Sequence, residues 1–199
     1  MLQKVDVVVF DFDGTLSASD SCFEFGKYCF KHSLSAWLYL PVIGIGYVAC
    51  MLNPNGIWWR RAIRFFIKSK HVKELTPQFI KHHKNLRFGW AKEQVAKEHR
   101  QGNKVVLISA GPDYLIPYLV ADMKFDAVIT SKQNKEKPWN YDFLCWGPNK
   151  VVALDNWAKE NKYIPNVIRS YSDSKSDLPI MNIAKEQIWI DSKTGMRKN

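Results

Sequence analysis

The stretch VDVVVFDFDGTL, residues 5–16, decides the fold: an apolar segment ends in two carboxylates and a Gly-Thr turn. Alternation along an extended chain places Asp11 and Asp13 on one face and Phe12 on the other, toward the core. Gly14 allows a sharp turn and a close backbone approach to a ligand. A parallel strand that ends this way opens at the usual ligand crevice of α/β proteins. A solvated helix cap would explain one acid but not two followed by Gly-Thr, so we predict a functional site.

Composition indicates a globular protein that needs no disulfides. The chain has 199 residues, of which 46% are hydrophobic, enough for a core in one elaborated domain or two small domains. Its four cysteines show no C-x-x-C spacing and no nearby His that would suggest zinc, so we expect reduced, packed thiols. The first apolar run, 7–10, is too short for a secretory leader, so we expect a cytoplasmic protein.

The positive charge is concentrated in one region. The formal net charge is +10, and the segment from Gly56 to Lys104 carries thirteen Lys or Arg against three Glu, which is the whole excess. Such a patch attracts nucleic acid, an anionic membrane or a phosphorylated substrate, and a solvated helix face is the simpler alternative. The sign of the charge alone does not distinguish among these alternatives.

Apolar strands alternate with helices along most of the chain. We expect strands at 5–10, 105–108, 125–130, 167–171 and 187–190, helices at 21–31, 114–120 and about 150–161, a turn at 109–112 and a hairpin-like stretch at 139–146. The pattern predicts an α/β fold with a Rossmann-like, mostly parallel sheet. We assign residues 1–18 and 93–199 to this core, and 19–92 to a helical cap inserted after the first strand.

The cap contains an unusually apolar segment, 34–52, whose length suffices for a membrane span but which Pro41, Gly44 and Gly46 interrupt. A single crossing would separate Asp11 from every later site residue. A return through 57–67 would bury Arg60, Arg61 and Arg64, each at a cost of at least about 2.5–3.5 kcal/mol. Two interpretations of this segment remain: a cap that packs on itself, and a hairpin that lies at the membrane surface. We favour the hairpin because Trp58-Trp59 and the basic patch accompany it.

Further polar residues follow apolar strands or open helices. Ser109, Lys150, Asp173 and Asp177 should therefore converge near Asp11 at one edge of a parallel sheet. Taken singly, each has a simpler interpretation as a turn residue, a solvated lysine or a helix cap.

In this order, the four motifs resemble those of the haloacid dehalogenase-like superfamily of phosphotransferases across residues 5–20 and about 104–191. The resemblance implies that Asp11 is a nucleophile that becomes an aspartyl phosphate. It implies that Asp13 is the acid/base that protonates the leaving alkoxide and then activates water. It further implies that Ser109 and Ala110 hold the phosphoryl group and that Lys150 neutralises its charge.

The same resemblance implies bound Mg²⁺. Asp173 would bind the ion together with the Asp11 side chain and the Asp13 carbonyl, supported by Asp177 and Ser174. Hard oxygen ligands suit Mg²⁺, and phosphoryl transfer depends on positioning and charge neutralisation. A dehalogenase has little use for Asp13 or a metal carboxylate, so we predict a phosphatase.

The cap insert and the SDSKSDLP pattern at 172–179 resemble the phosphoserine-phosphatase-like subgroup. Asp20 replaces the Glu that is usual in phosphoserine phosphatases, and Ser109-Ala110-Gly111 replaces Ser-Gly-Gly. The uncharged cap is more similar to that of phosphatidylglycerophosphatases, which implies a lipid phosphate substrate. A small soluble phosphomonoester is the alternative. Asp20, Arg60 and Arg61 are the candidates for contacting the leaving group.

We also expect contact with an anionic membrane, at the inner face of the cell membrane. A basic nucleic-acid- or membrane-binding module without catalysis would account for the charge but would leave the four motifs unused. We therefore expect no nucleic-acid partner.

Overall fold

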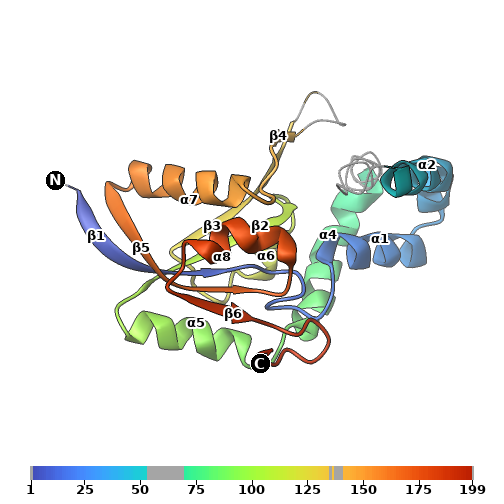
Figure 1. Ribbon diagram of the computed structural model, residues 1–199. Helices are drawn as coiled ribbons and strands as arrows, with labels where there is room; N and C mark the ends of the chain where they lie inside the picture. The colour runs from blue at the N-terminus through green and yellow to red at the C-terminus, as the bar shows by residue number, and fades with distance from the viewer. Residues whose placement is uncertain (1, 53–69, 135, 137–140, 199) are drawn as a thin grey trace.

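The computed structural model describes residues 2–52, 70–134, 136 and 141–198. Its centre is a six-stranded sheet in the order β4-β3-β2-β1-β5-β6 (Figure 1). The strands are β1 (Gln3–Phe10), β2 (Lys104–Pro112), β3 (Ala127–Gln133), β4 (Tyr141–Phe143), β5 (Tyr163–Ser172) and β6 (Glu186–Trp189). All neighbouring strands pair in parallel except β3 and β4, which are antiparallel. The α/β fold with a mostly parallel sheet is therefore confirmed.

Strand β1 lies inside the sheet, and its second half, Val7 to Phe10, is buried on both faces, which explains the continuous apolar run there. Val8 and Phe10 belong to one hydrophobic cluster, and Val7 and Val9 belong to another. Helices α5 (Ala91–Arg100) and α6 (Ile116–Leu119) pack on the first side, while α7 (Asn149–Glu160) and α8 (Leu178–Asn182) pack on the second (Figure 1). The sheet is thus a middle layer with helices on both faces.

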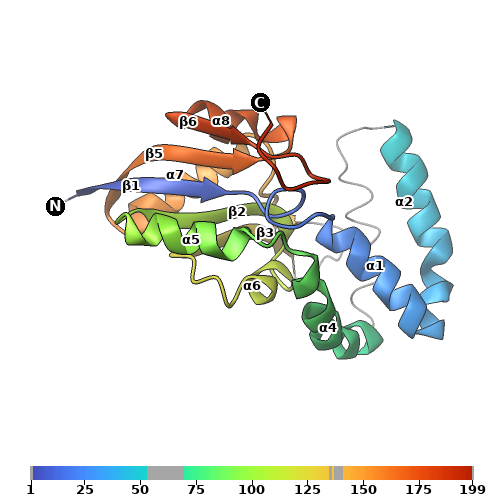
Figure 2. The same cartoon turned by 90° about the horizontal axis from the view of Figure 1, so that it is seen from below.

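A further group of helices lies beyond the carboxyl ends of the parallel strands, to one side of the sheet (Figure 2). They are α1 (Ser21–His32), the 3₁₀ helix η1 (Leu34–Tyr39), α2 (Leu40–Leu52), α4 (Lys70–His83) and the short 3₁₀ helix η2 (Lys84–Leu86). Phe25 of α1 and Phe79 of α4 are buried against each other, with ring centroids 4.9 Å apart. The division into core 1–18 and 93–199 and cap 19–92 stays a prediction.

Two local predictions are wrong. Residues 109–112 were expected to form a turn, but they continue β2, and Pro112 pairs with Ser131 after a register shift. Gly44 and Gly46 were expected to interrupt the apolar segment, but both lie within α2. Pro41 is tolerated in the first turn of α2, where a backbone N–H has no helical partner.

The other expected elements differ mainly in length. Helix 114–120 is reduced to the four residues of α6, β5 begins four residues earlier than expected, and β4 accounts for the strand of the 139–146 stretch. The expected interfacial segment 57–67 lies outside the described residues, as do Arg60 and Arg61. Within the described part of the chain, no helix has both the length and the apolar character to cross a membrane.

Candidate active site

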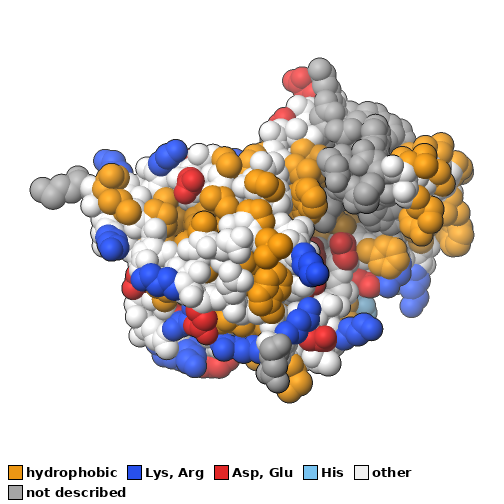
Figure 3. Space-filling view, in the orientation of Figure 1, with side chains coloured by type: hydrophobic (Ala, Val, Ile, Leu, Met, Phe, Trp, Pro, Cys, Tyr) orange, Lys and Arg blue, Asp and Glu red, His pale blue; other side chains and the backbone are white. Residues whose placement is uncertain are grey.

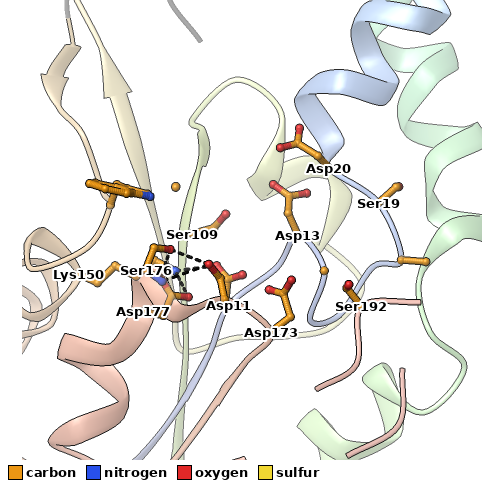
Figure 4. A pocket seen from close by; sticks show the side chains of 15 residues that line it. Asp11, Asp13, Ser19, Asp20, Ser109, Lys150, Asp173, Ser176, Asp177 and Ser192 are labelled. Carbon is orange, nitrogen blue, oxygen red and sulfur yellow. Dashed lines mark hydrogen bonds and ion pairs between the residues drawn. The ribbon is translucent and has the colours of Figure 1, made fainter. Parts of the chain in front are cut away.

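A cavity of about 360 Å³ opens at the carboxyl ends of the parallel strands, between the sheet and the start of α1 (Figure 4). Its lining includes nine residues that the sequence singled out: Asp11, Asp13, Asp20, Ser109, Ala110, Lys150, Asp173, Ser174 and Asp177. The structure therefore brings together all the predicted site residues that it describes. Arg60 and Arg61 lie outside the described residues.

Lys150 lies in the first turn of α7 and is only 2% exposed, so its interpretation as a solvated lysine is wrong. Its Nζ donates to Asp11 Oδ1 and to Asp177 Oδ2, both at 2.7 Å. Burial alone would lower the pKa of Lys150, but these carboxylates raise it above its ordinary value. Asp177 Oδ2 also accepts a 2.7 Å hydrogen bond from Ser172 Oγ. Lys150 is therefore a buried, charged group fixed between two acids.

Asp11 directly follows β1, and its backbone N–H donates to the Tyr171 carbonyl of β5 at 3.0 Å. Burial raises the pKa of the Asp11 side chain to about 7, while Lys150 opposes that rise. Oδ1 is paired with Lys150, and Oδ2 accepts a long 3.5 Å hydrogen bond from Thr15 Oγ1. The carboxylate is thus oriented by its neighbours at the base of the cavity.

Asp173, at the end of β5, approaches the turn that follows β1. Thr15 Oγ1 is 3.4 Å from Asp173 Oδ1 and accepts a 3.0 Å hydrogen bond from the Asp173 backbone N–H. Gly14 has a φ of 76°, and a Cβ there would lie 2.2 Å from Asp173 Oδ2. Burial also raises the pKa of Asp173. Thr15 therefore bridges Asp11 and Asp173, and the close approach that Gly14 permits is to Asp173.

Asp13 points into the same cavity from the turn after β1 (Figure 4). Both its oxygens accept from Ser21, the first residue of α1: Oδ1 from the backbone N–H at 2.7 Å and Oδ2 from Oγ at 3.1 Å. Burial, followed by the charges of Asp20 and Asp11, raises the pKa of Asp13 well above its usual range. The first residue of α1 thus holds Asp13 in an environment that favours the protonated form of its side chain.

The remaining predicted residues have local hydrogen bonds. Asp20, predicted to contact the leaving group, is the N-cap of α1 and accepts from the Phe23 backbone N–H at 2.9 Å. Ser109 Oγ accepts from the Gly111 backbone N–H at 3.0 Å, an interaction that uses its oxygen and not its proton. Ser174 caps the 3₁₀ helix η3 (Lys175–Asp177).

Sequence reasoning missed several residues of the site. Thr15 and Ser21 position the acids, and Trp146, Ser176 and Ser192 contribute to the cavity wall. Thr15 could have been found, since it follows Asp11 and Asp13 in the opening motif. The position of Ser21 after a helix-capping Asp20 is a weaker signal, and no spacing marks Trp146 or Ser192.

The candidate metal ligands are carboxylate and carbonyl oxygens. Within residues 2–52, 70–134, 136 and 141–198, no group of three or more His, Cys, Asp or Glu side chains could hold a metal ion. The predicted set needs only two carboxylates, Asp11 and Asp173, with the carbonyl of Asp13. Mg²⁺ commonly takes one or two protein carboxylates together with waters and substrate oxygens.

The chain shares its fold with known proteins. Several solved structures share the fold, each covering 94% of this chain. A protein of unknown function from Bordetella pertussis Tohama I has a TM-score of 0.76 and 14% identity over 91% of its own chain. A substrate-bound phosphoserine phosphatase has a TM-score of 0.65 and 16% identity over 87%. A phospho-aspartyl intermediate analogue of phosphoserine phosphatase has a TM-score of 0.63 and 17% identity over 87%.

A search of curated proteins found no match. The family of haloacid dehalogenase-like hydrolases matches residues 8–182, which run from the second half of β1 to the end of α8 and include every predicted site residue. The chain therefore belongs to the haloacid dehalogenase-like hydrolase family.

Proposed function

We propose that this hydrolase is a Mg²⁺-dependent phosphomonoesterase that works through an aspartyl phosphate on Asp11. The observation that carries the proposal is the buried ion pair of Lys150 with Asp11 at the base of the cavity. A carboxylate that attacks an anionic phosphoryl group needs a fixed cation beside it. The likeness to phosphoserine phosphatase structures, one of them a phospho-aspartyl intermediate analogue, supports the same chemistry.

In the first step, an Asp11 oxygen attacks phosphorus and the bond from phosphorus to the ester oxygen breaks. Asp13 gives its proton to the departing alkoxide, a role that its raised pKa suits. Lys150 offsets the negative charge on Asp11, and Ser109 donates its hydroxyl proton to a phosphoryl oxygen. In the second step, Asp13 takes a proton from water as the water attacks phosphorus, which releases phosphate and regenerates Asp11.

The donor set fits a hard divalent cation. Asp11, Asp13, Asp173 and Asp177 line one cavity in which Lys150 is the only cationic side chain among the described lining residues. Burial, with a smaller contribution from neighbouring acids, raises the pKa values of Asp11, Asp13 and Asp173, and a bound cation would favour their ionised forms. The Asp11 and Asp173 side chains and the Asp13 carbonyl would hold Mg²⁺, which supplies positive charge to the nucleophile and the phosphoryl oxygens.

For the substrate we propose a lipid phosphate such as phosphatidylglycerophosphate, hydrolysed at the inner face of an anionic membrane. Its support is the exposed apolar surface of η1 and α2, which follow helix α1, whose N-cap Asp20 lines the cavity. The second candidate is a small soluble phosphomonoester, which the cavity of about 360 Å³ and its polar lining favour. Asp20, on the cavity wall, would face the leaving group in either case.

A phosphate-release assay tests the proposal. The purified chain would be given Mg²⁺ with phosphatidylglycerophosphate in mixed micelles, phosphoserine or a small sugar phosphate. We expect hydrolysis that requires Mg²⁺ and is abolished in Asp11→Asn. Activity that survives in Asp11→Asn would overturn the aspartyl-phosphate mechanism, and activity on phosphoserine alone would replace the lipid substrate with the soluble one.

A further inference from the structure

The outer part of the cap carries an apolar surface, formed by the exposed side chains of η1 and α2 (Figure 3). Ile45 is 71% exposed, Val48 is 55% exposed and Leu52 is 83% exposed. Leu34, Trp37, Leu38, Leu40, Tyr47 and Met51 are also exposed. Single exposed apolar residues are ordinary in proteins, but a run of this kind on one element marks an interaction site. We call it the η1–α2 surface.

Helix α2 lacks the polar face that a helix at the surface of a globular protein normally has. Its sequence, LPVIGIGYVACML, contains no charged residue, and its exposed residues lie along one side of the helix, opposite the buried Ile43 and Gly46. A helix that is apolar all round is normally enclosed by protein or by lipid. Among its described side chains, Ile43 is the large one that is buried. Water is therefore an unfavourable environment for the exposed apolar side chains of α2.

The length of α2 limits how the helix could lie in a lipid bilayer. Thirteen residues make a helix about 20 Å long, whereas the hydrocarbon core of a bilayer is about 30 Å thick. The helix is too short to cross. It can instead lie in one leaflet at the boundary between headgroups and acyl chains, as interfacial helices do.

Charge distinguishes a membrane from a protein partner. No charged residue occurs between Ser33 and Trp59, so the η1–α2 surface offers no ion pair to fix the register of a protein partner. Lysine side chains do adjoin it on the last turns of α1, where Lys31 is exposed shortly before η1, and Lys27, one turn earlier, is exposed and paired with Glu24. Basic groups flanking an apolar surface attract anionic headgroups at about 1 kcal/mol each.

We infer that the η1–α2 surface is a docking surface that inserts into one leaflet of an anionic lipid bilayer. The inference rests on the proposed function for its purpose, because a lipid phosphate would be reached from the membrane surface. The adjoining helix α1 begins at Ser21, which holds Asp13 in the cavity. Docking through η1 and α2 would therefore bring the cavity entrance close to the headgroups.

The test compares two helical valines of similar exposure. Val48 of α2 is 55% exposed, and Val152 of α7, which lies outside the η1–α2 surface, is 47% exposed. Wild type, Val48→Glu and Val152→Glu would be floated with vesicles of phosphatidylcholine alone or with 30% phosphatidylglycerol. Because no substrate or Mg²⁺ is added, a protein without phosphatase activity could still float with the vesicles. Failure of the proposed function is therefore distinguishable from failure of membrane docking. Thermal unfolding and sedimentation velocity of each variant complete the set.

We expect wild type and Val152→Glu to float with the anionic vesicles, and Val48→Glu to bind them at least about tenfold more weakly, since a buried charge costs well over the 1.4 kcal/mol that a factor of ten requires. Equal binding by Val48→Glu would overturn the inference. So would absence of flotation in wild type. In that case, loss of a dimer in Val48→Glu would show a second copy on this surface, and a lowered melting temperature would show packing within the protein.

Discussion

The Lys150 ammonium lies 2.7 Å from Asp11 Oδ1, although 139 positions separate the two residues in sequence. Asp11 comes from the end of β1, before the cap helices, and Lys150 comes from α7, after β4. Their contact therefore exists only when the two parts of the sheet on either side of the insertion have assembled. The charge of the proposed nucleophile is therefore balanced only in the folded protein.

Lys150→Met should reduce both activity and stability. Asp11 and Asp177 would lose their shared buried cation, and breaking a buried pair typically costs about 3–5 kcal/mol. We expect a fall in activity of at least about 10²- to 10³-fold, the usual effect of removing one electrostatic group from an active site. Chemical denaturation and phosphate release would measure the two effects.

The matched control is Lys159→Met, on the same helix but with an exposed side chain. It should change the free energy of unfolding by less than about 0.5 kcal/mol, as surface substitutions usually do. Equal behaviour of the two variants would contradict the role given to the Lys150 ion pairs.

Ser21→Ala should slow catalysis by altering Asp13. The hydroxyl of Ser21 donates to Asp13 Oδ2 at 3.1 Å and so favours the ionised acid. Its loss removes a bond of about 1.5–3 kcal/mol, equivalent to roughly 10- to 100-fold in rate if the orientation of Asp13 is lost with it.

The pH–rate profile gives a second readout for this variant. The pKa of Asp13 should rise in Ser21→Ala, moving the alkaline limb of kcat upward, whereas a purely structural defect would lower the whole profile. Ser21→Thr keeps the hydroxyl and should restore the rate and the limb. A profile with an unmoved limb in Ser21→Ala would show that Ser21 does not act through Asp13.

Gly14→Ala should impair Mg²⁺ binding. The added Cβ would lie 2.2 Å from Asp173 Oδ2 and displace that carboxylate from the turn. We expect the Mg²⁺ concentration for half-maximal activity to rise at least about tenfold, and the stabilisation of the protein by Mg²⁺ in thermal unfolding to decline, because a bound ligand stabilises the folded state in proportion to its affinity.

Gly102→Ala separates backbone strain from crowding. Gly102 has a similar φ of +83°, but no heavy atom lies within 4 Å of a Cβ built there. It should lose about 1–2 kcal/mol of stability from the left-handed conformation while keeping the Mg²⁺ dependence of wild type. A Gly14→Ala protein with the same Mg²⁺ response as Gly102→Ala would show that Asp173 is not a ligand.

The sequence predicted the sheet and the acids well because their signals are local. The apolar run of β1 and the Asp11-Phe12-Asp13-Gly14 turn are contiguous, so alternation alone predicts which side chains face the cavity. Parallel topology then brings Lys150 and Asp173 to the same edge. The family match over residues 8–182 confirms the resemblance.

Long-range packing explains what the sequence could not predict. Ser21 reaches Asp13 because the chain after β1 turns so that α1 begins beside Asp13, and Gly14 meets Asp173 only because β5 lies beside β1. The extension of β2 through Pro112 depends likewise on pairing with Ser131 of β3. Glycine and proline usually signal a turn in isolation, but tertiary pairing overrides that preference here.

His83 should make the protein less stable in mild acid. Its ring is fully buried at the end of α4, with its centroid 5.0 Å from that of Phe79 and 6.3 Å from that of Phe12. Burial lowers its pKa from 6.5 to about 4. Between these values the unfolded chain binds a proton that the folded protein does not, so stability falls as pH drops from about 6.5 to 4.

Replacement of His83 by phenylalanine isolates this effect from other titrating groups. The pKa difference corresponds to about 3 kcal/mol between neutral pH and pH 4, and His83→Phe should remove that part of the pH dependence. His82→Phe, which replaces the exposed neighbouring histidine, should keep it. Urea unfolding of the three proteins at pH 7.5, 5.5 and 4.5 measures the slopes. If wild type and His83→Phe lose stability in parallel, the buried ring is not the group whose protonation opposes folding, and the contact between α4 and the turn after β1 tolerates the charged imidazole.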